Sequence, residues 1–89
     1  VLESIGRDFF EESAQSLIEL RRAYSESDLE MVRLFSHKMK GAAANLRFNV
    51  ISDLLSSVEE NSSAANKEFD YTGYFDNIES ELSVLRNVF

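Results

Sequence analysis

The sequence predicts an all-α domain, an antiparallel up-down-up-down bundle of four helices. The chain of 89 residues has no proline and only three glycines, which favours long helices over a turn-rich β fold. Apolar residues recur at intervals of three and four in four segments, which is the helical period. The segments between them are short and polar, and short connections place consecutive helices antiparallel. We expect residues 1–89 to form a single domain.

The first helix is expected over residues 1–25, although Gly6 also allows a regular start only near Arg7. Phe10 and Ile18 lie at the edge of its apolar face. They are either peripheral core residues or an apolar patch for a partner. The apolar face itself consists of Leu2, Ile5, Phe9, Leu17, Leu20 and Tyr24.

The second helix is predicted to begin at a capping box, with Ser27 at the cap and Glu30 three residues later. It continues to about Asn45 or Leu46. At about 100° per residue, one face gathers Met31, Val32, Phe35, Met39, Ala42, Ala43 and Leu46.

The third helix is predicted from about Val50 to Asn61, with Asn49 as its N-cap. Its inward residues are expected to be Ile51, Leu54, Leu55 and Val58, and those facing water Ser56, Ser57, Glu59 and Glu60.

The fourth helix is predicted from a cap at Asp70 to about Asn87. Its apolar residues recur cleanly at threes and fours, as in a helix with one buried face. They are Tyr71, Tyr74, Phe75, Ile78, Leu82, Leu85 and Phe89.

Composition excludes several functions. A formal net charge of −7 argues against nucleic acid as a partner, because phosphate backbones require a concentrated cationic surface. The absence of cysteine excludes disulfides, a thiol nucleophile and thiolate metal ligands, and agrees with a reducing cytoplasm. No stretch approaches the roughly 18 apolar residues of a membrane span. We expect a monomer without direct membrane insertion.

His37 is the only histidine, and it falls in the middle of the second predicted helix, almost opposite the apolar face. Lys40, Gly41 and Ala44 follow it at i+3, i+4 and i+7, so the imidazole should stand on an open surface beside a cation. Glycine within a helix costs about 1 kcal/mol relative to alanine. Access of another protein to the imidazole would explain Gly41; alternatively, Gly41 is tolerated or packs under another helix.

The residues around His37 limit the chemistry available to it. One histidine without cysteine cannot supply the three or four ligands of a usual zinc site, and we expect no metal in this domain. Acid–base catalysis would need a substrate pocket and an orienting carboxylate, for which only Glu30 lies near the same face. Ser36 points about 100° away, which argues against a serine hydrolase. Accepting a phosphoryl group needs little more than an accessible neutral imidazole.

At these residues the chain resembles the histidine-containing phosphotransfer (HPt) domains of multistep two-component signalling. Their signature is a histidine, two variable residues, lysine, glycine, a small residue, and leucine five positions after the glycine. It is matched in full by His37-Lys38-Met39-Lys40-Gly41-Ala42 and Leu46. Many members have glycine where this chain has Arg47, a departure in the turn after the second helix. The resemblance extends over essentially the whole sequence.

The resemblance implies that His37 accepts a phosphoryl group from an aspartate of a response-regulator receiver domain and passes it to another receiver. In the family the phosphorylated nitrogen is Nε2, a choice that this sequence alone does not make. Lys40 would stabilise the phosphoryl charge, and Gly41 and Ala44 would keep the surface open. The other candidate partner contacts on the second helix are Leu34, Lys38 and Arg33. Phe10, Ile18 and Phe48 complete the candidate docking set.

The resemblance also implies a phosphocarrier without kinase activity of its own and without a cofactor, the Mg²⁺ being held by the receiver. We expect it to be a fragment of a larger signalling protein such as a hybrid sensor kinase. That parent would be cytoplasmic, or the domain would be the cytoplasmic part of a membrane-bound kinase.

Two other functions fit a helical domain with an exposed histidine. One is a passive helical adaptor in which His37 is incidental. The other is the dimerisation domain of a sensor histidine kinase, which typically has an acidic residue after the histidine and a proline soon after. Lys38 follows here and proline is absent, so this second alternative is disfavoured.

Overall fold

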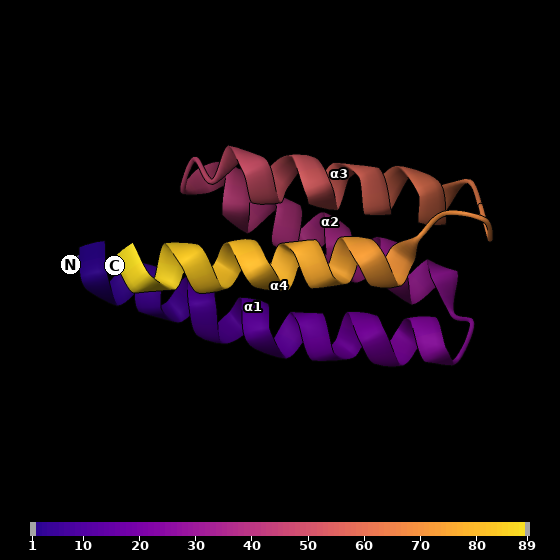
Figure 1. The fold of residues 1–89 in the computed structure, drawn as a ribbon, viewed down its shortest axis with the longest axis horizontal. Coiled ribbons are helices and arrows are strands. Elements are labelled where there is room, and N and C mark those ends of the chain that lie inside the picture. The colour runs from indigo at the N-terminus through magenta and orange to yellow at the C-terminus, as the bar shows by residue number, and fades with distance from the viewer. Residues whose placement is uncertain (1, 89) are drawn as a thin grey trace.

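The computed structural model describes the backbone of residues 2–88 and the side chains of residues 8–88. In chain order the helices are α1 (Leu2–Ser25), α2 (Leu29–Asn45), α3 (Asn49–Ser63) and α4 (Tyr71–Val88), and no strand occurs in that range. They run alternately up and down, so that the two chain ends lie at the same end of the bundle (Figure 1). The predicted four-helix bundle is confirmed. The expected apolar positions Leu2, Ile5 and Phe89 lie outside the described side chains.

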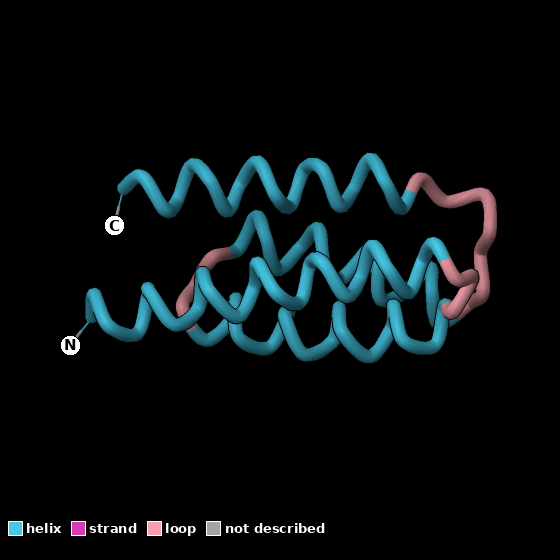
Figure 2. The backbone as a smooth tube through the Cα atoms, turned by 90° about the horizontal axis from the view of Figure 1, so that it is seen from below, coloured by secondary structure: helices cyan, strands magenta, loops and turns pink. Residues whose placement is uncertain are grey.

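Each helix packs against its neighbours in the chain, and α4 closes the bundle against α1. The most extensive contact is between α2 and α3, which a short turn joins at one end of the molecule (Figure 2). The bundle is 39 Å long, close to the roughly 36 Å that the 24 residues of α1 span at 1.5 Å each. The side chain of a residue in the middle of α2 therefore projects from the side of the bundle, not from its end.

One core connects all four helices, and the predicted inward residues form most of it. Its fully buried members include Leu20 of α1, Ile51 and Leu55 of α3, and Tyr71 and Phe75 of α4. The buried face of α2 differs from the prediction: Met31 and Ala42 are exposed, whereas the buried residues are Val32, Ser36, Met39 and Ala43.

Ser36 explains this difference. It lies fully buried on the inward face, and its hydroxyl donates a hydrogen bond to the Val32 carbonyl, 2.7 Å away. A buried hydroxyl that is satisfied by its own helix carries little penalty. Ser62 of α3 is buried in the same way, donating to the Val58 carbonyl at 2.8 Å.

Three helices end in the same backbone motif. After α2, the N–H of Arg47 donates to the Ala44 carbonyl and the N–H of Phe48 donates to the Ala43 carbonyl, at 3.1 and 2.9 Å. These two bonds define a Schellman motif. The residue after the C-cap, here Arg47, has a left-handed backbone conformation that glycine adopts most readily. None of the three helices has glycine at this position: the left-handed residues are Ser27, Arg47 and Ala65, with φ of 59°, 61° and 55°.

The Schellman motifs correct two predicted N-caps. Ser27 belongs to the turn, so Asp28 is the N-cap of α2 and its carboxylate accepts from the Met31 N–H at 3.2 Å. Asn49 is the first residue of α3, and the preceding Phe48 occupies the cap position without a side-chain hydrogen bond. The predicted cap of α4 is confirmed, because Asp70 accepts from the Gly73 N–H at 3.1 Å.

Candidate functional site

His37 lies halfway along α2 with 66% of its side chain exposed. One turn later, a Cβ placed on Gly41 would meet no atom within 4 Å. The interpretation that Gly41 packs under another helix is therefore wrong, and the surface beside the imidazole is open as predicted. The effect of that openness on a partner stays a prediction.

The imidazole leans toward α3, where Nδ1 lies 2.8 Å from Oε2 of Glu59. An ionised carboxylate only accepts hydrogen bonds, so this contact requires the proton to be on Nδ1. In the neutral ring Nε2 then carries the free lone pair. The structure thus favours Nε2 as the nucleophilic nitrogen, a choice that the sequence left open.

Lys40 contacts the same carboxylate from α2. Its ammonium nitrogen lies 2.5 Å from Oε1 of Glu59 and forms an ion pair with it, although the geometry is not that of a hydrogen bond. Only 19% of the Glu59 side chain is exposed. The Lys40 ammonium and, to a smaller extent, the His37 ring hold the pKa of Glu59 below its usual value, against the opposing effect of burial. Glu59 is therefore a carboxylate at neutral pH and links the two predicted site residues.

Glu59 is the functional residue that sequence analysis missed, because it was expected to face water. Helical periodicity places it beside the buried Val58, at the edge of the inward face of α3. Periodicity does not show which neighbouring helix that edge approaches. Charge offers a signal: α2 carries Arg33, Lys38 and Lys40 against Glu30 alone, and α3 carries acids and no basic residue.

Arg33 is engaged elsewhere. Its guanidinium forms two contacts with Glu30, 2.5 Å from Oε1 and 3.2 Å from Oε2. That hydrogen-bonded pair raises the pKa of Arg33 and lowers that of Glu30. The carboxylate bonded to His37 is therefore Glu59, while Glu30 is held by Arg33. Arg33 can influence the site only through its charge.

The remaining α2 candidates are accessible. Leu34 is 45% exposed, and Lys38 and Ala44 are also exposed. Their contact with a partner stays a prediction.

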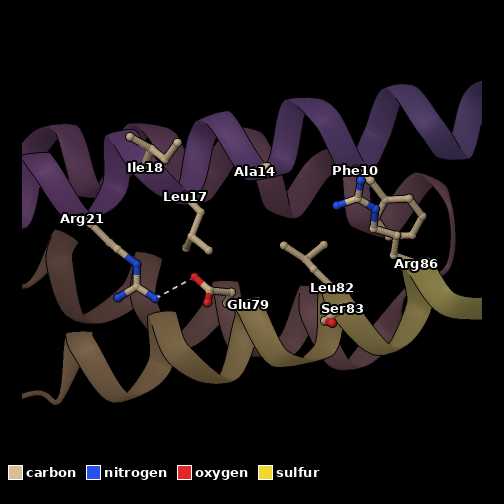
Figure 3. Close-up of a pocket in the computed structure, with 9 residues that line it drawn as sticks. All are labelled: Phe10, Ala14, Leu17, Ile18, Arg21, Glu79, Leu82, Ser83 and Arg86. Carbon is tan, nitrogen blue, oxygen red and sulfur yellow. Dashed lines mark hydrogen bonds and ion pairs between the residues drawn. The ribbon is translucent and has the colours of Figure 1, made fainter.

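Phe10 is not available to a partner in the way that was predicted. Only 9% of it is exposed, and its ring packs against Phe9 and Phe48 with centroids 5.5 and 6.2 Å apart. It closes one end of a groove of about 330 Å³ between α1 and α4, whose floor includes Leu17 and Leu82 (Figure 3). Phe10 is part of the core because the rings of Phe9 and Phe48, from α1 and the α2–α3 turn, pack around it edge-to-face and stacked. Ile18, on the rim of that groove, is 54% exposed.

A second groove, of about 390 Å³, borders the site on the α3 side. Its walls are Lys40, Ser56, Glu59, Glu60, Ser63 and Ala64. In the described residues no three His, Cys, Asp or Glu side chains are grouped so as to hold a metal ion. None of the described helices combines the length and apolar character that crossing a membrane requires.

This arrangement suits a nucleophile that acts on a group presented by another macromolecule. The ring stands on a convex helix surface, with its proton held by a carboxylate and its second nitrogen bearing a lone pair. That resembles the way in which a carboxylate orients a catalytic imidazole in hydrolases.

Comparison with known proteins agrees with this geometry. A family model described as Hpt domain matches residues 5–87. Searches of curated proteins and of solved structures found no match. Proteins of the matched family carry phosphoryl groups on a histidine in phosphorelays and are not kinases. With four helices, an exposed imidazole and a family match over nearly its whole length, the chain belongs to the Hpt domain family.

Proposed function

We propose that this domain is a phosphorelay intermediate in which His37 accepts a phosphoryl group from a receiver-domain aspartate and transfers it to another receiver. The observation that carries the proposal is the contact between Nδ1 of His37 and Glu59, which leaves the lone pair of the neutral ring on Nε2 in a largely exposed side chain. Membership of the Hpt family supports the class of reaction.

In the proposed transfer, the Nε2 lone pair attacks the phosphorus of the partner's aspartyl phosphate. The Nε2–P bond forms as the bond between phosphorus and the aspartate oxygen breaks, and the partner regains a free carboxylate. The ring becomes positively charged while Nδ1 keeps its proton, and the Glu59 carboxylate at 2.8 Å stabilises that charge. Transfer to the next receiver reverses these changes.

The two other site residues have supporting roles in this proposal. Lys40 lies one turn from His37 and would turn from Glu59 toward the phosphoryl oxygens as they arrive, offsetting their charge. Gly41 leaves room for the partner's loops. The Mg²⁺ that supports chemistry at the aspartate would be held by the receiver.

The domain acts in this proposal as a monomeric phosphocarrier without kinase activity. We infer that it works in the cytoplasm, within a hybrid sensor kinase or a similar signalling protein.

The test is phosphoryl transfer from a panel of phosphorylated receiver domains to the wild type and to His37→Gln. The proposal predicts acid-labile, base-stable label on the wild type alone, with both proteins equally folded. A passive adaptor would bind a receiver and take up no label, and label on the glutamine variant would assign the reaction to another residue.

A further inference from the structure

The position of the imidazole shows which neighbouring helix shares the surface around it. His37 is bonded to Glu59 of α3, and α2 and α3 lie side by side along the bundle (Figure 1). A partner that contacts the His37 ring therefore also lies close to this edge of α3. The groove of about 390 Å³ runs along this edge and shares two walls with the site, Lys40 and Glu59.

The groove is lined by small and polar side chains and not by apolar ones. Ser56, Ser63 and Ala64 leave it wide, so that a side chain from outside can enter. The hydroxyl groups of Ser56 and Ser63 offer hydrogen bonds, and the groove contains no aromatic or branched aliphatic residue that would favour an apolar occupant.

The electrostatics of this groove favour a cation. Glu59 is already neutralised by Lys40, but Glu60 is exposed and forms no ion pair with a described residue. The groove also reaches the C-terminal end of α3, where the helix dipole is negative. No basic residue occupies the last turn of α3 to offset that charge.

On the other side of His37 the charge is reversed. Lys38 is exposed on α2 without an ion pair in the described part of the chain, and projects about 100° away from His37 around the helix. The phosphoryl acceptor therefore lies between a positive rim on α2 and a negative groove on α3. Charges arranged in this way fix the orientation of a docking partner and raise its association rate.

We propose that the α3 groove is a specificity site of the docking surface, and that it takes a lysine or arginine side chain of the receiver at Glu60. This inference rests on the proposed function, since it assumes that a receiver reaches His37. It assigns to Glu60, Ser56 and Ser63 a role in choosing among receivers, separate from the chemistry at His37.

The experiment compares Glu60→Gln and Glu60→Lys with the wild type in phosphotransfer from the receiver that transfers best, at low and at high salt. The matched control is Glu11→Gln, an exposed carboxylate on α1 that does not line the groove and whose removal changes the net charge equally. We expect kcat/KM to fall about two- to fivefold in Glu60→Gln, the range of an exposed ion pair, and more in Glu60→Lys. The loss should lie in association and disappear at high salt, because rim charges act mainly on the on-rate.

A charge exchange completes the test. A receiver in which the matching basic residue is replaced by glutamate should recover transfer with Glu60→Lys and not with the wild type. If Glu60→Gln and Glu11→Gln have equal effects while the wild type accepts phosphate at His37, the specificity site is refuted and the phosphorelay function stands. If no receiver binds or phosphorylates the wild type, both are refuted.

Discussion

Glu59→Gln separates the carboxylate that orients His37 from the imidazole itself. The variant keeps the shape of the side chain and removes its charge. Its amide oxygen can still accept the Nδ1 proton, so at His37 only the charge-assisted part of a hydrogen bond of 2.8 Å is lost. Lys40 keeps access to solvent, with 31% of its side chain exposed, so the variant should fold.

The expected magnitude follows from the type of bond that is lost. A hydrogen bond to a charged group contributes about 1.5–3 kcal/mol and a neutral one about 1 kcal/mol. The difference is therefore about 0.5–2 kcal/mol. Because 66% of the imidazole is exposed, solvent screens it, and we take a value in the lower half of that range, about 1 kcal/mol. The positive charge develops on the ring only as the Nε2–P bond forms. The loss should therefore appear in the transfer step, as a rate about fivefold lower.

The assay is single-turnover phosphotransfer over a range of receiver concentrations, which separates the saturating rate from the half-saturating concentration. Repeating it in a Lys40→Ala background removes the effect of a lysine that Glu59→Gln has released. An unchanged saturating rate in both backgrounds would refute the reasoning, as would a change confined to the half-saturating concentration.

The other predictions concern charge, access and stability. Lys40→Ala should slow the transfer step at saturating receiver or shorten the lifetime of the phosphohistidine several-fold. Lys38→Ala should change neither, because a rim charge acts on association. Equal saturating rates and lifetimes in the two variants would show that Lys40 is an ordinary solvated lysine. Gly41→Leu should slow transfer yet stabilise the fold by about 0.5–1 kcal/mol in urea unfolding, because a Cβ there meets no atom and leucine favours helix. Gly41→Ala is the control, which should stabilise the fold without slowing transfer. Normal transfer by the leucine variant would contradict the access argument. Arg47→Gly should raise the free energy of unfolding by about 0.5 kcal/mol, because the backbone strain that it removes at a φ of 61° exceeds the cost of a more flexible unfolded chain. Arg47→Ala retains the strain and should not stabilise the protein. A glycine variant less stable than the wild type would contradict this reasoning. The pKa of Glu59 is lowered on folding, so the carboxylate contributes to stability above the ordinary pKa of about 4.3, and this contribution is lost as the pH falls through the lowered value. The difference in unfolding free energy between the wild type and Glu59→Gln should therefore vanish in acid. A difference that persists in acid would show that it does not arise from charge.

The helices could be predicted because their signals are local. Residues such as Ile51, Leu55, Phe75 and Ile78 recur at helical intervals, and all four are buried. The same periodicity placed His37 on the outer face of α2, which the structure confirms. Patterns of this kind depend only on the period of the helix, which does not change with its surroundings.

What the sequence did not reveal depends on how helices meet. Ser36 is polar, yet it is fully buried, with its hydroxyl satisfied by the Val32 carbonyl of its own helix. Glu59 is an acid at the edge of α3, and its role arises from the two α2 residues that reach it. Ser27 was predicted as a cap from a short motif, but the Schellman bonds at the end of α1 place it in the turn. In each case a tertiary or backbone contact overrides a local preference.

The most direct test of the central claim uses the fact that His37 is the only histidine. In protein labelled with ¹⁵N, one imidazole supplies all of the ring-nitrogen signals, and phosphoramidate or a phosphorylated receiver can supply the phosphoryl group. The account predicts that Nδ1 carries the proton before the reaction, and that ³¹P–¹⁵N coupling then appears at Nε2. Coupling at Nδ1, or a phosphorylated protein whose imidazole signals do not change, would contradict it.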